Sequence, residues 1–318
     1  MNIPVLLKTY FPLSSGLYLG WALGSNDAAN VFGTAVATGV IPFSWAAVSI
    51  LIFATIGAVL EGYGGFSTLG KFGSVTPWDA FWIAFSAALS VTIMTIFGLP
   101  VSTSQAIVGA IIGAGIVNGT LNLAPLAKVL ISWISTPIGA GLISYILYFI
   151  IAPIIKRSSR SMFGWDKFIF WGLFLSGIYG AYSLGANNVA NVMGVFVNAK
   201  VVSPFMGALL GGLSIGVGAL TYGRKVMETV GKDIVRLSPY TAFVVVLAEA
   251  LTVHFFAVVG VPVSTSQAVV GGVVGIGFVE GISRIDRKTV SKIFFGWLGT
   301  PTIAAFVAGL VVFLAHLF

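Results

Sequence analysis

The sequence has no cysteine, and only 8% of its 318 residues are charged. Without cysteine, the chain can form neither disulfide bonds nor thiolate metal sites. An ordinary soluble domain is about 25% charged. The low charge and a mean hydropathy of +1.04 therefore exclude a sizeable water-soluble domain.

Long apolar runs fill much of the chain instead. They cover residues 80–99, 129–155, 241–261 and 293–317. Each reaches the length of about 20 residues that a helix needs to cross a bilayer. Backbone groups have no water partner in lipid, so these runs must be helical. The 40 glycines fit closely packed membrane helices. We expect an all-α, polytopic protein of the cell membrane.

The chain contains an internal duplication. Residues 98–119 and 260–281 are identical at 14 of 22 positions with an offset of 162, and both contain the string PVSTSQA. A second pair, GSNDAANVFGTAV and GANNVANVMGVFV, begins at residues 24 and 185 with an offset of 161. Collinear matches at a nearly constant offset indicate two structural repeats. We place the first repeat at 1–155, a basic linker at 156–167 and the second repeat at 168–318.

The basic residues indicate how the repeats lie in the membrane. Twelve of the 16 lie in three short loops, which is how a membrane protein marks its cytoplasmic side, and this pattern argues against nucleic-acid binding. Two of these loops have counterparts in the first repeat with only Lys71 and Lys128. Corresponding loops should therefore lie on opposite faces. This predicts inverted-topology repeats, a cytoplasmic linker and extracellular termini. The twelve residues are Lys156, Arg157, Arg160, Lys167, Arg224, Lys225, Lys232, Arg236, Arg284, Arg287, Lys288 and Lys292.

Two segments of each repeat differ from ordinary membrane spans. Residues 100–118 and 262–280 are short and begin with polar residues, and residues 14–36 and 168–198 are interrupted by Gly and Asn. Such segments at matching positions in two repeats are typical of a transporter's binding site. We expect broken helices or helical hairpins that meet near the midplane. We count five crossings per repeat: 14–36, 44–60, 77–98, 100–118 and 129–152, then 168–198, 201–222, 238–260, 262–280 and 292–316.

The first polar cluster predicts an anion site. A proline followed by Ser and Thr marks a helix N-terminus, where free N–H groups and the helix dipole favour an anion. Hydroxyl and amide groups add neutral donors, and the clusters contain no Lys or Arg, which suits a carrier that must release its cargo. The alternative is that the small polar residues only hold helices together. The candidate residues are Ser102, Thr103, Ser104, Gln105, Ser264, Thr265, Ser266 and Gln267.

The second polar cluster predicts a cation site. Amide and carboxylate oxygens are ligands that hard cations prefer. Asp27 is the strongest single signal, because a carboxylate inside a bilayer is costly unless it is paired. A cation held there would offset the charge of a neighbouring anion, and each would favour the other's binding. The alternative is an interhelical hydrogen-bond network. The candidate residues are Asn26, Asp27, Asn30, Asn187, Asn188 and Asn191.

Three further ionisable residues have less distinct patterns. Glu249 lies in an apolar stretch, and its aligned residue in the first repeat is Ala87. It is either a proton or cation site or a residue paired with a neighbour. Glu61 lies near a helix end and is expected at the membrane interface. His254 has no ligand partner nearby in the sequence, so we expect a packing or interface role.

The doubled motifs resemble those of the inorganic phosphate transporter family (PiT) of cation-coupled symporters. The resemblance rests on GSNDAANVFGTAV, GANNVANVMGVFV and the two PVSTSQ strings, together with GRKVMETVGKDI at 223–234, and it spans nearly the whole chain. It implies an inverted-repeat fold, a homodimer, and import of inorganic phosphate with Na⁺ or H⁺. The family's motif positions correspond to the polar residues of both clusters.

The sequence departs from the family pattern at two places that bear on coupling. Many members have Asp in both copies of the first motif, where this chain has Asn188 in the second. Many members read Ser-Thr-Thr-His where this chain reads Ser-Thr-Ser-Gln. The missing histidine favours Na⁺ over H⁺ as the coupling ion.

We therefore interpret the chain as a secondary active transporter. It would import phosphate by Na⁺-coupled symport with alternating access. The resemblance leaves a proton-coupled sulfate permease of the same family as the alternative, and an anion channel is the alternative from another class. An enzyme is not expected, because the sequence offers no nucleophile–base pair and no His/Glu metal set.

Overall fold

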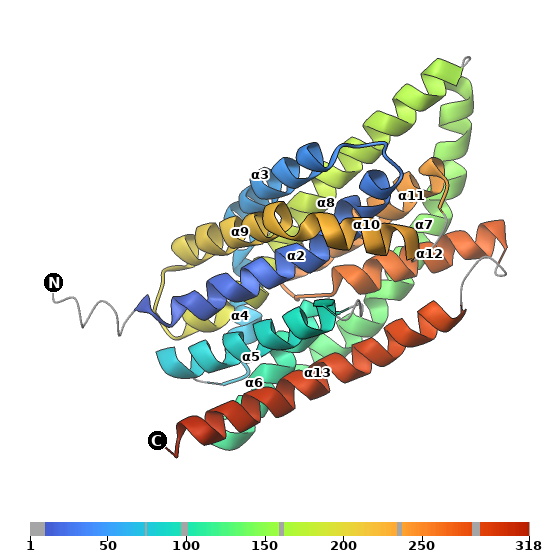
Figure 1. Ribbon diagram of the computed structural model, residues 1–318. Helices are drawn as coiled ribbons and strands as arrows, with labels where there is room; N and C mark the ends of the chain where they lie inside the picture. Colours follow the sequence, from blue (N-terminus) through green and yellow to red (C-terminus); the bar gives the residue numbers. More distant parts are fainter. Residues whose placement is uncertain are drawn as a thin grey trace.

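The computed structural model describes residues 10–73, 75–96, 101–158, 162–233, 237–281 and 287–317 (Figure 1). Within these ranges the regular structure is entirely α-helical, which confirms the expected class. Seven of the helices in this described part of the chain are long and apolar enough to cross a membrane. The helices are α2 Leu13–Ala37, α3 Phe43–Glu61, α4 Tyr63–Gly70, α5 Pro77–Ile96, α6 Thr103–Asn118, α7 Leu126–Ser158, α8 Met162–Asn198, α9 Pro204–Thr221, α10 Gly223–Asp233, α11 Pro239–Val259, α12 Thr265–Glu280 and α13 Arg287–Ala315.

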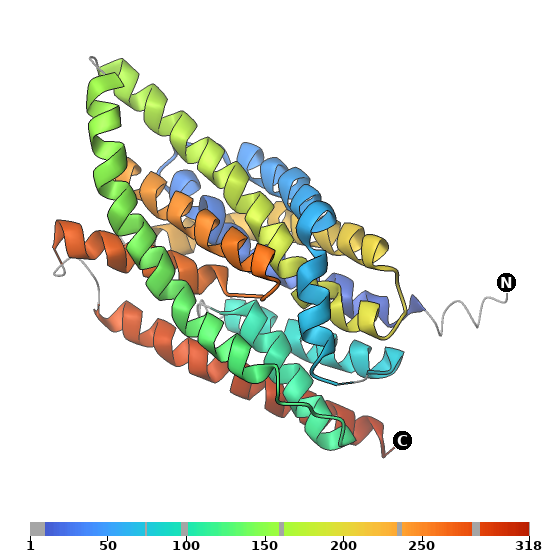
Figure 2. The ribbon, with the colours of Figure 1, turned by 180° about the vertical axis from the view of Figure 1, so that it is seen from behind.

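Two hairpins differ from the expected crossings. Helices α6 and α12 have 16 residues each, so each is about 24 Å long at a rise of 1.5 Å per residue, short of the ~30 Å hydrocarbon core. Helix α6 turns back beside α5, and α12 turns back beside α11, from opposite ends of the molecule (Figures 1 and 2). The count of five full crossings per repeat was therefore wrong, and the expected hairpins are present.

The long helices run between the two ends of the molecule. Helix α7 leaves the end where α2 begins and α13 finishes, and α8 returns from the opposite end (Figures 1 and 2). Much of the expected basic linker 156–167 is helical, because α7 continues to Ser158 and α8 begins at Met162. The predicted loop near residue 224 is likewise helix α10. Arg160, Arg236 and Arg284 lie outside the described residues.

Several helices of each half pack against helices of the other half. Helix α6 of the first half packs on α13 of the second, and α12 of the second packs on α7 of the first. Similarly, α2 packs on α9, and α8 packs on α3. The core therefore forms across the two halves, and the hairpins are enclosed by long helices of the opposite half.

Glycines at matching positions make this close packing possible. A methyl group added at Gly109 of α6 would overlap the carbonyl oxygen of Pro301, and one at Gly271 of α12 would overlap that of Pro137. These contacts are equivalent under the duplication, since 109 pairs with 271 and 137 with 301. Small residues at such positions let helix backbones approach closely. Residues that the duplication pairs in the sequence therefore make equivalent contacts in the structure.

Candidate transport site

The tips of the two hairpins meet. Ser104 Oγ donates to the carbonyl oxygen of Val263 at 2.7 Å, and Ser266 Oγ donates to that of Val101 at 3.0 Å. The two bonds are equivalent under the duplication. Each hairpin therefore holds the extended residues that precede the other's short helix. The two polar clusters that the sequence places far apart lie side by side.

Each tip is the N-terminus of a short helix. Ser102 caps α6 by accepting from the backbone N–H of Gln105 at 3.3 Å, and Ser264 caps α12 by accepting from that of Gln267 at 3.3 Å. The first turn of a helix has N–H groups without intrahelical partners, and its dipole favours negative charge. Two such ends at one place provide donors suited to a small oxyanion.

The polar cluster of α2 reaches the tip of the other half. Asn30 Nδ2 donates to Thr265 Oγ1 at 3.2 Å, and the side chains of Thr265 and Asp27 also form a hydrogen bond. Asp27 is only 3% exposed. Helix α2 therefore brings a buried carboxylate directly to the N-terminus of α12.

The polar cluster of α8 contacts the other hairpin tip, at the N-terminus of α6. Asn191 Nδ2 donates to Ser104 Oγ at 2.8 Å and to Asn188 Oδ1 at 2.9 Å. Ser104 Oγ also lies 3.4 Å from Asn188 Oδ1. In both arms, therefore, an asparagine of a long helix in one half binds a hydroxyl at the hairpin tip of the other, although Thr265 and Ser104 are not equivalent positions.

Asn26 and Asn187 have a different role from their neighbours in this geometry. Asn187 Nδ2 donates to the Val261 carbonyl at 3.2 Å, and its Oδ1 accepts from the Val263 N–H at 3.0 Å. Asn26 Nδ2 donates to Thr95 Oγ1 at 2.9 Å. The sequence placed both residues among the cation ligands. In the structure their amide groups bind α5 and the segment that leads into the second hairpin tip, and their role as cation ligands stays a prediction.

Several polar atoms at the site are buried without a hydrogen-bond partner. Asp27 Oδ1 and Asn191 Oδ1 are unpartnered acceptors, and the Thr103 hydroxyl and Asn188 Nδ2 are unpartnered donors. A buried polar group without a partner is costly and calls for an explanation. Oxygen acceptors fit a hard cation such as Na⁺, and donors at helix N-termini fit an anion. Gln105 Oε1 and Gln267 Oε1 are also unpartnered.

A second buried carboxylate lies near the first. Glu249 of α11 is 1% exposed, its Oε2 has no hydrogen-bond partner, and it interacts electrostatically with Asp27. Two neighbouring negative charges cannot both remain buried without compensation. A cation or a proton at this place would supply it. Among the described residues, no group of three His, Cys, Asp or Glu side chains could hold a transition metal.

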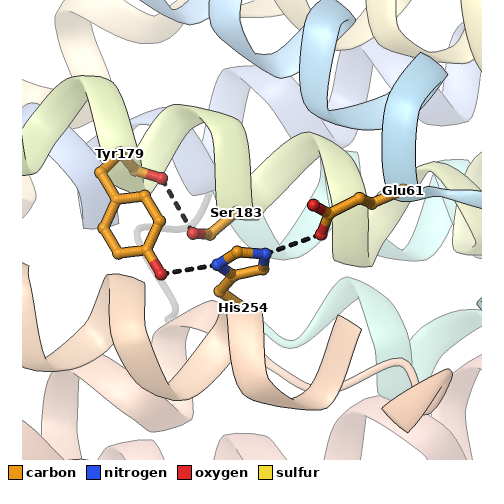
Figure 3. Close-up of polar contacts among 4 residues, drawn as sticks. All are labelled: Glu61, Tyr179, Ser183 and His254. Carbon is orange, nitrogen blue, oxygen red and sulfur yellow. Dashed lines mark hydrogen bonds and ion pairs between the residues drawn. The ribbon is translucent and has the colours of Figure 1, made fainter. Parts of the chain in front are cut away.

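Sequence reasoning missed several polar partners. His254 is not isolated: its Nε2 lies 2.7 Å from Glu61 Oε2, and its Nδ1 lies 2.6 Å from the Tyr179 hydroxyl (Figure 3). Thr68 Oγ1 donates to the Gly260 carbonyl at 2.6 Å beside the second hairpin tip. These residues come from different helices and share no short motif. No local signal in the sequence could have joined them.

Comparisons with known proteins agree with this architecture. A sequence model of the phosphate transporter family matches residues 23–308. A protein of Methanocaldococcus jannaschii named as a phosphate permease is 31% identical, with 97% of this chain and 98% of the relative covered. A protein of Pyrococcus furiosus with the same type of name is 28% identical over 97% of this chain and 95% of the relative.

A solved structure also matches. It is that of a sodium-dependent phosphate transporter, with a TM-score of 0.85 and 25% sequence identity. The match covers 98% of this chain and 99% of that one. The arrangement of hairpins and long helices is therefore shared along the whole chain.

Proposed function

Because the chain belongs to the phosphate transporter family, we propose that it imports inorganic phosphate across the cell membrane by Na⁺-coupled symport. The sodium-dependent phosphate transporter with the same fold supports both the substrate and the coupling ion. The observation that carries the proposal is the meeting of two helix N-termini beside the buried carboxylate of Asp27.

Phosphate would bind between the hairpin tips. Ser102–Gln105 and Ser264–Gln267 would offer the multivalent oxyanion only neutral hydroxyl, amide and backbone donors, because neither stretch contains Lys or Arg. Neutral donors and helix dipoles hold such an anion, and they release it more readily than a buried cationic side chain would. This suits a carrier, whose cargo must leave on the other side.

Sodium would bind to oxygen atoms beside the anion. Asp27 and Asn191 offer unpartnered oxygens, and Asn30 and Asn188 lie next to them. The fit is chemical: hard oxygens suit Na⁺, and its charge offsets both the carboxylate and the phosphate. Each ligand then favours the other's binding, and the coupling is reciprocal.

Alternating access would use the two halves as inverted repeats. The mirrored hairpins and the packing of each half against the other support an inverted relation. The site residues are nearly inaccessible to solvent, which fits an occluded state between two openings. We further propose a homodimer with its termini outside the cell and the basic segments, including 156–167, in the cytoplasm.

Uptake of radiolabelled phosphate into proteoliposomes tests the function. We expect an inward Na⁺ gradient to concentrate the label inside, and a proton gradient alone to be ineffective. Excess unlabelled sulfate should not compete. Competition by sulfate together with proton-driven uptake would favour the sulfate permease. Uptake that ignores every cation gradient and never exceeds equilibrium would contradict symport and favour an anion channel.

A further inference from the structure

A second polar network lies outside the transport site and includes an imidazole. His254 of α11 contacts the Glu61 carboxylate of α3 through Nε2 and the Tyr179 hydroxyl of α8 through Nδ1 (Figure 3). The rings of Tyr179 and Tyr182 lie edge-on to the imidazole, with centroid distances of 5.4 and 5.6 Å. Tyr182 also forms a hydrogen bond with Glu61. Both ring nitrogens are therefore bonded, and three helices meet at this histidine.

The same place in the other half is neutral. Under the duplication His254 corresponds to Thr92, Tyr179 to Tyr18, and Glu61 to Tyr222. The Tyr18 hydroxyl donates to Thr92 Oγ1 at 2.9 Å, so the tyrosine contact is kept. Here Tyr222 makes a ring contact with Trp21. The chain thus has two copies of one junction, and the copy around His254 has an imidazole and a carboxylate where the other has a threonine and a tyrosine.

The ionisable junction adjoins the second hairpin. His254 lies just over one turn before the end of α11, and the next residues form the tip that holds Asn187 and Ser104. Glu61 is the last residue of α3, where the chain bends into α4. Thr68 of α4 binds the Gly260 carbonyl beside the tip. The His254–Glu61 contact and the Thr68–Gly260 hydrogen bond therefore join the α3–α4 bend to the hairpin at two points.

We propose that His254, Glu61 and Tyr179 form a proton-binding site that controls how firmly the α11–α12 hairpin is held to the α3–α4 bend. This inference rests on the proposed transport function for its consequence, although not for the site itself. A proton on the imidazole makes the Glu61 contact an ion pair, and its loss leaves a hydrogen bond from a neutral imidazole N–H to the carboxylate. The ion pair is the stronger tether. Hairpin opening is therefore slower when the site is protonated.

The titratable neighbours of the imidazole are few. The described titratable groups that contact it are Glu61 at the end of α3 and Tyr179 and Tyr182 of α8. On α11 itself, Glu249 interacts instead with Asp27 of α2. Histidine is the side chain whose charge ordinarily changes between about pH 5 and 8. The network therefore has one group suited to sensing physiological pH.

Nuclear magnetic resonance tests the site without any transport. The chain has 2 histidines, so a histidine-labelled His316→Asn protein in lipid nanodiscs gives the signal of His254 alone. We expect Glu61→Gln to change the imidazole signal and its response to pH, because Nε2 loses its carboxylate partner. Glu228→Gln, which removes an exposed carboxylate elsewhere, should leave it unchanged. An imidazole that titrates identically in the Glu61→Gln protein would overturn the proposal.

Uptake at different pH values tests the consequence. We expect the Na⁺-driven rate to rise about two- to fivefold more between about pH 5.5 and 7.5 in the wild type than in His254→Thr, as expected for a partly exposed ion pair. The substrate's own ionisation affects both proteins equally. Threonine is chosen because Thr92 occupies the equivalent position in the other half. Tyr18→Phe and Tyr179→Phe form a matched pair of variants, because the two tyrosines are also equivalent. Only Tyr179→Phe should alter the pH profile.

The outcomes separate the two proposals. If Glu61→Gln changes the His254 signal as expected but the wild-type protein takes up no phosphate, the proposed function is refuted and the proton site stands. Normal Na⁺-driven uptake with identical pH profiles in wild type and His254→Thr would refute the control of the hairpin.

Discussion

In both arms of the site an asparagine of a long helix binds a hydroxyl of the opposite hairpin tip, but the arms differ in charge. In one arm Asn30 of α2 binds Thr265, and in the other Asn191 of α8 binds Ser104. The first arm has Asp27, whereas the equivalent position of the second has Asn188. Glu249 adds a further carboxylate near Asp27. The duplication therefore provides two similar arms, and the carboxylates of Asp27 and Glu249 lie on one side.

Of the variants that test this difference between the arms, those that remove or move the carboxylate should have the largest effect. We expect Asp27→Asn to lower the apparent Na⁺ affinity of uptake by about ten- to a hundredfold, because a charge-assisted contact contributes about 1.5–3 kcal/mol. The measurement is phosphate uptake as a function of Na⁺ concentration. A swap protein, Asp27→Asn with Asn188→Asp, restores the total charge in the other arm. Recovery of wild-type affinity in the swap would show that only the total charge matters, against the proposed asymmetry.

The mirrored glycine contacts should respond equally. Gly109→Ala and Gly271→Ala each force a methyl group against a backbone carbonyl, and overpacking of this kind costs about 1–3 kcal/mol. We expect similar decreases in the melting temperature of both purified proteins. Gly299→Ala in α13 is the control, because its nearest atom is Ile303 Cδ1 at 4.0 Å. Unequal losses for the first two would contradict the equivalence of the two packing interfaces.

The duplication explains how much of the site could be predicted from sequence. The matching PVSTSQA strings placed Ser104 and Ser266 at equivalent helix starts. Polar residues at membrane depth almost always face the bundle interior. The capped helices α6 and α12 and the meeting of the tips followed from that. The lengths of the apolar runs likewise gave the long helices within a few residues.

The remaining features depend on which helix faces meet. The Glu249–Asp27 and His254–Glu61 neighbours come from helices far apart in the chain, and apolar sequence surrounds Glu249 and His254. A membrane helix that is apolar on all sides has no clear periodicity to indicate its buried face. The positions of these side chains could therefore not be predicted. The hydrogen bonds of Asn187 to the hairpin backbone could not be predicted either.

A smaller difference between the arms is expected at the asparagines. Asn191 makes two hydrogen bonds at the site, to Ser104 and Asn188, whereas Asn30 makes one, to Thr265. At about 0.5–1.5 kcal/mol per bond, Asn191→Ala should weaken apparent phosphate affinity by about tenfold and Asn30→Ala by about threefold. Uptake as a function of phosphate concentration gives both values. A larger loss for Asn30→Ala would indicate that its role exceeds its hydrogen bond, for instance as a direct ligand.

The smallest expected effect concerns the two serines that join the hairpin tips. Ser266 Oγ donates to the Val101 carbonyl at 3.0 Å, and Ser104 Oγ donates to that of Val263 at 2.7 Å while also accepting from Asn191. Removal of either hydroxyl loses the bond between the tips and one further contact. Ser104→Ala leaves a buried amide of Asn191 with one partner fewer, whereas Ser266→Ala removes a 2.8 Å contact with the hydroxyl of Ser264. We expect Ser266→Ala to lower the uptake rate about twofold and Ser104→Ala by more. Ser203→Ala, which alters an exposed helix cap at α9, controls for the loss of any serine hydroxyl. Equal effects of the two tip variants would mean that the tip-to-tip bond, shared by both arms, outweighs the support from α8.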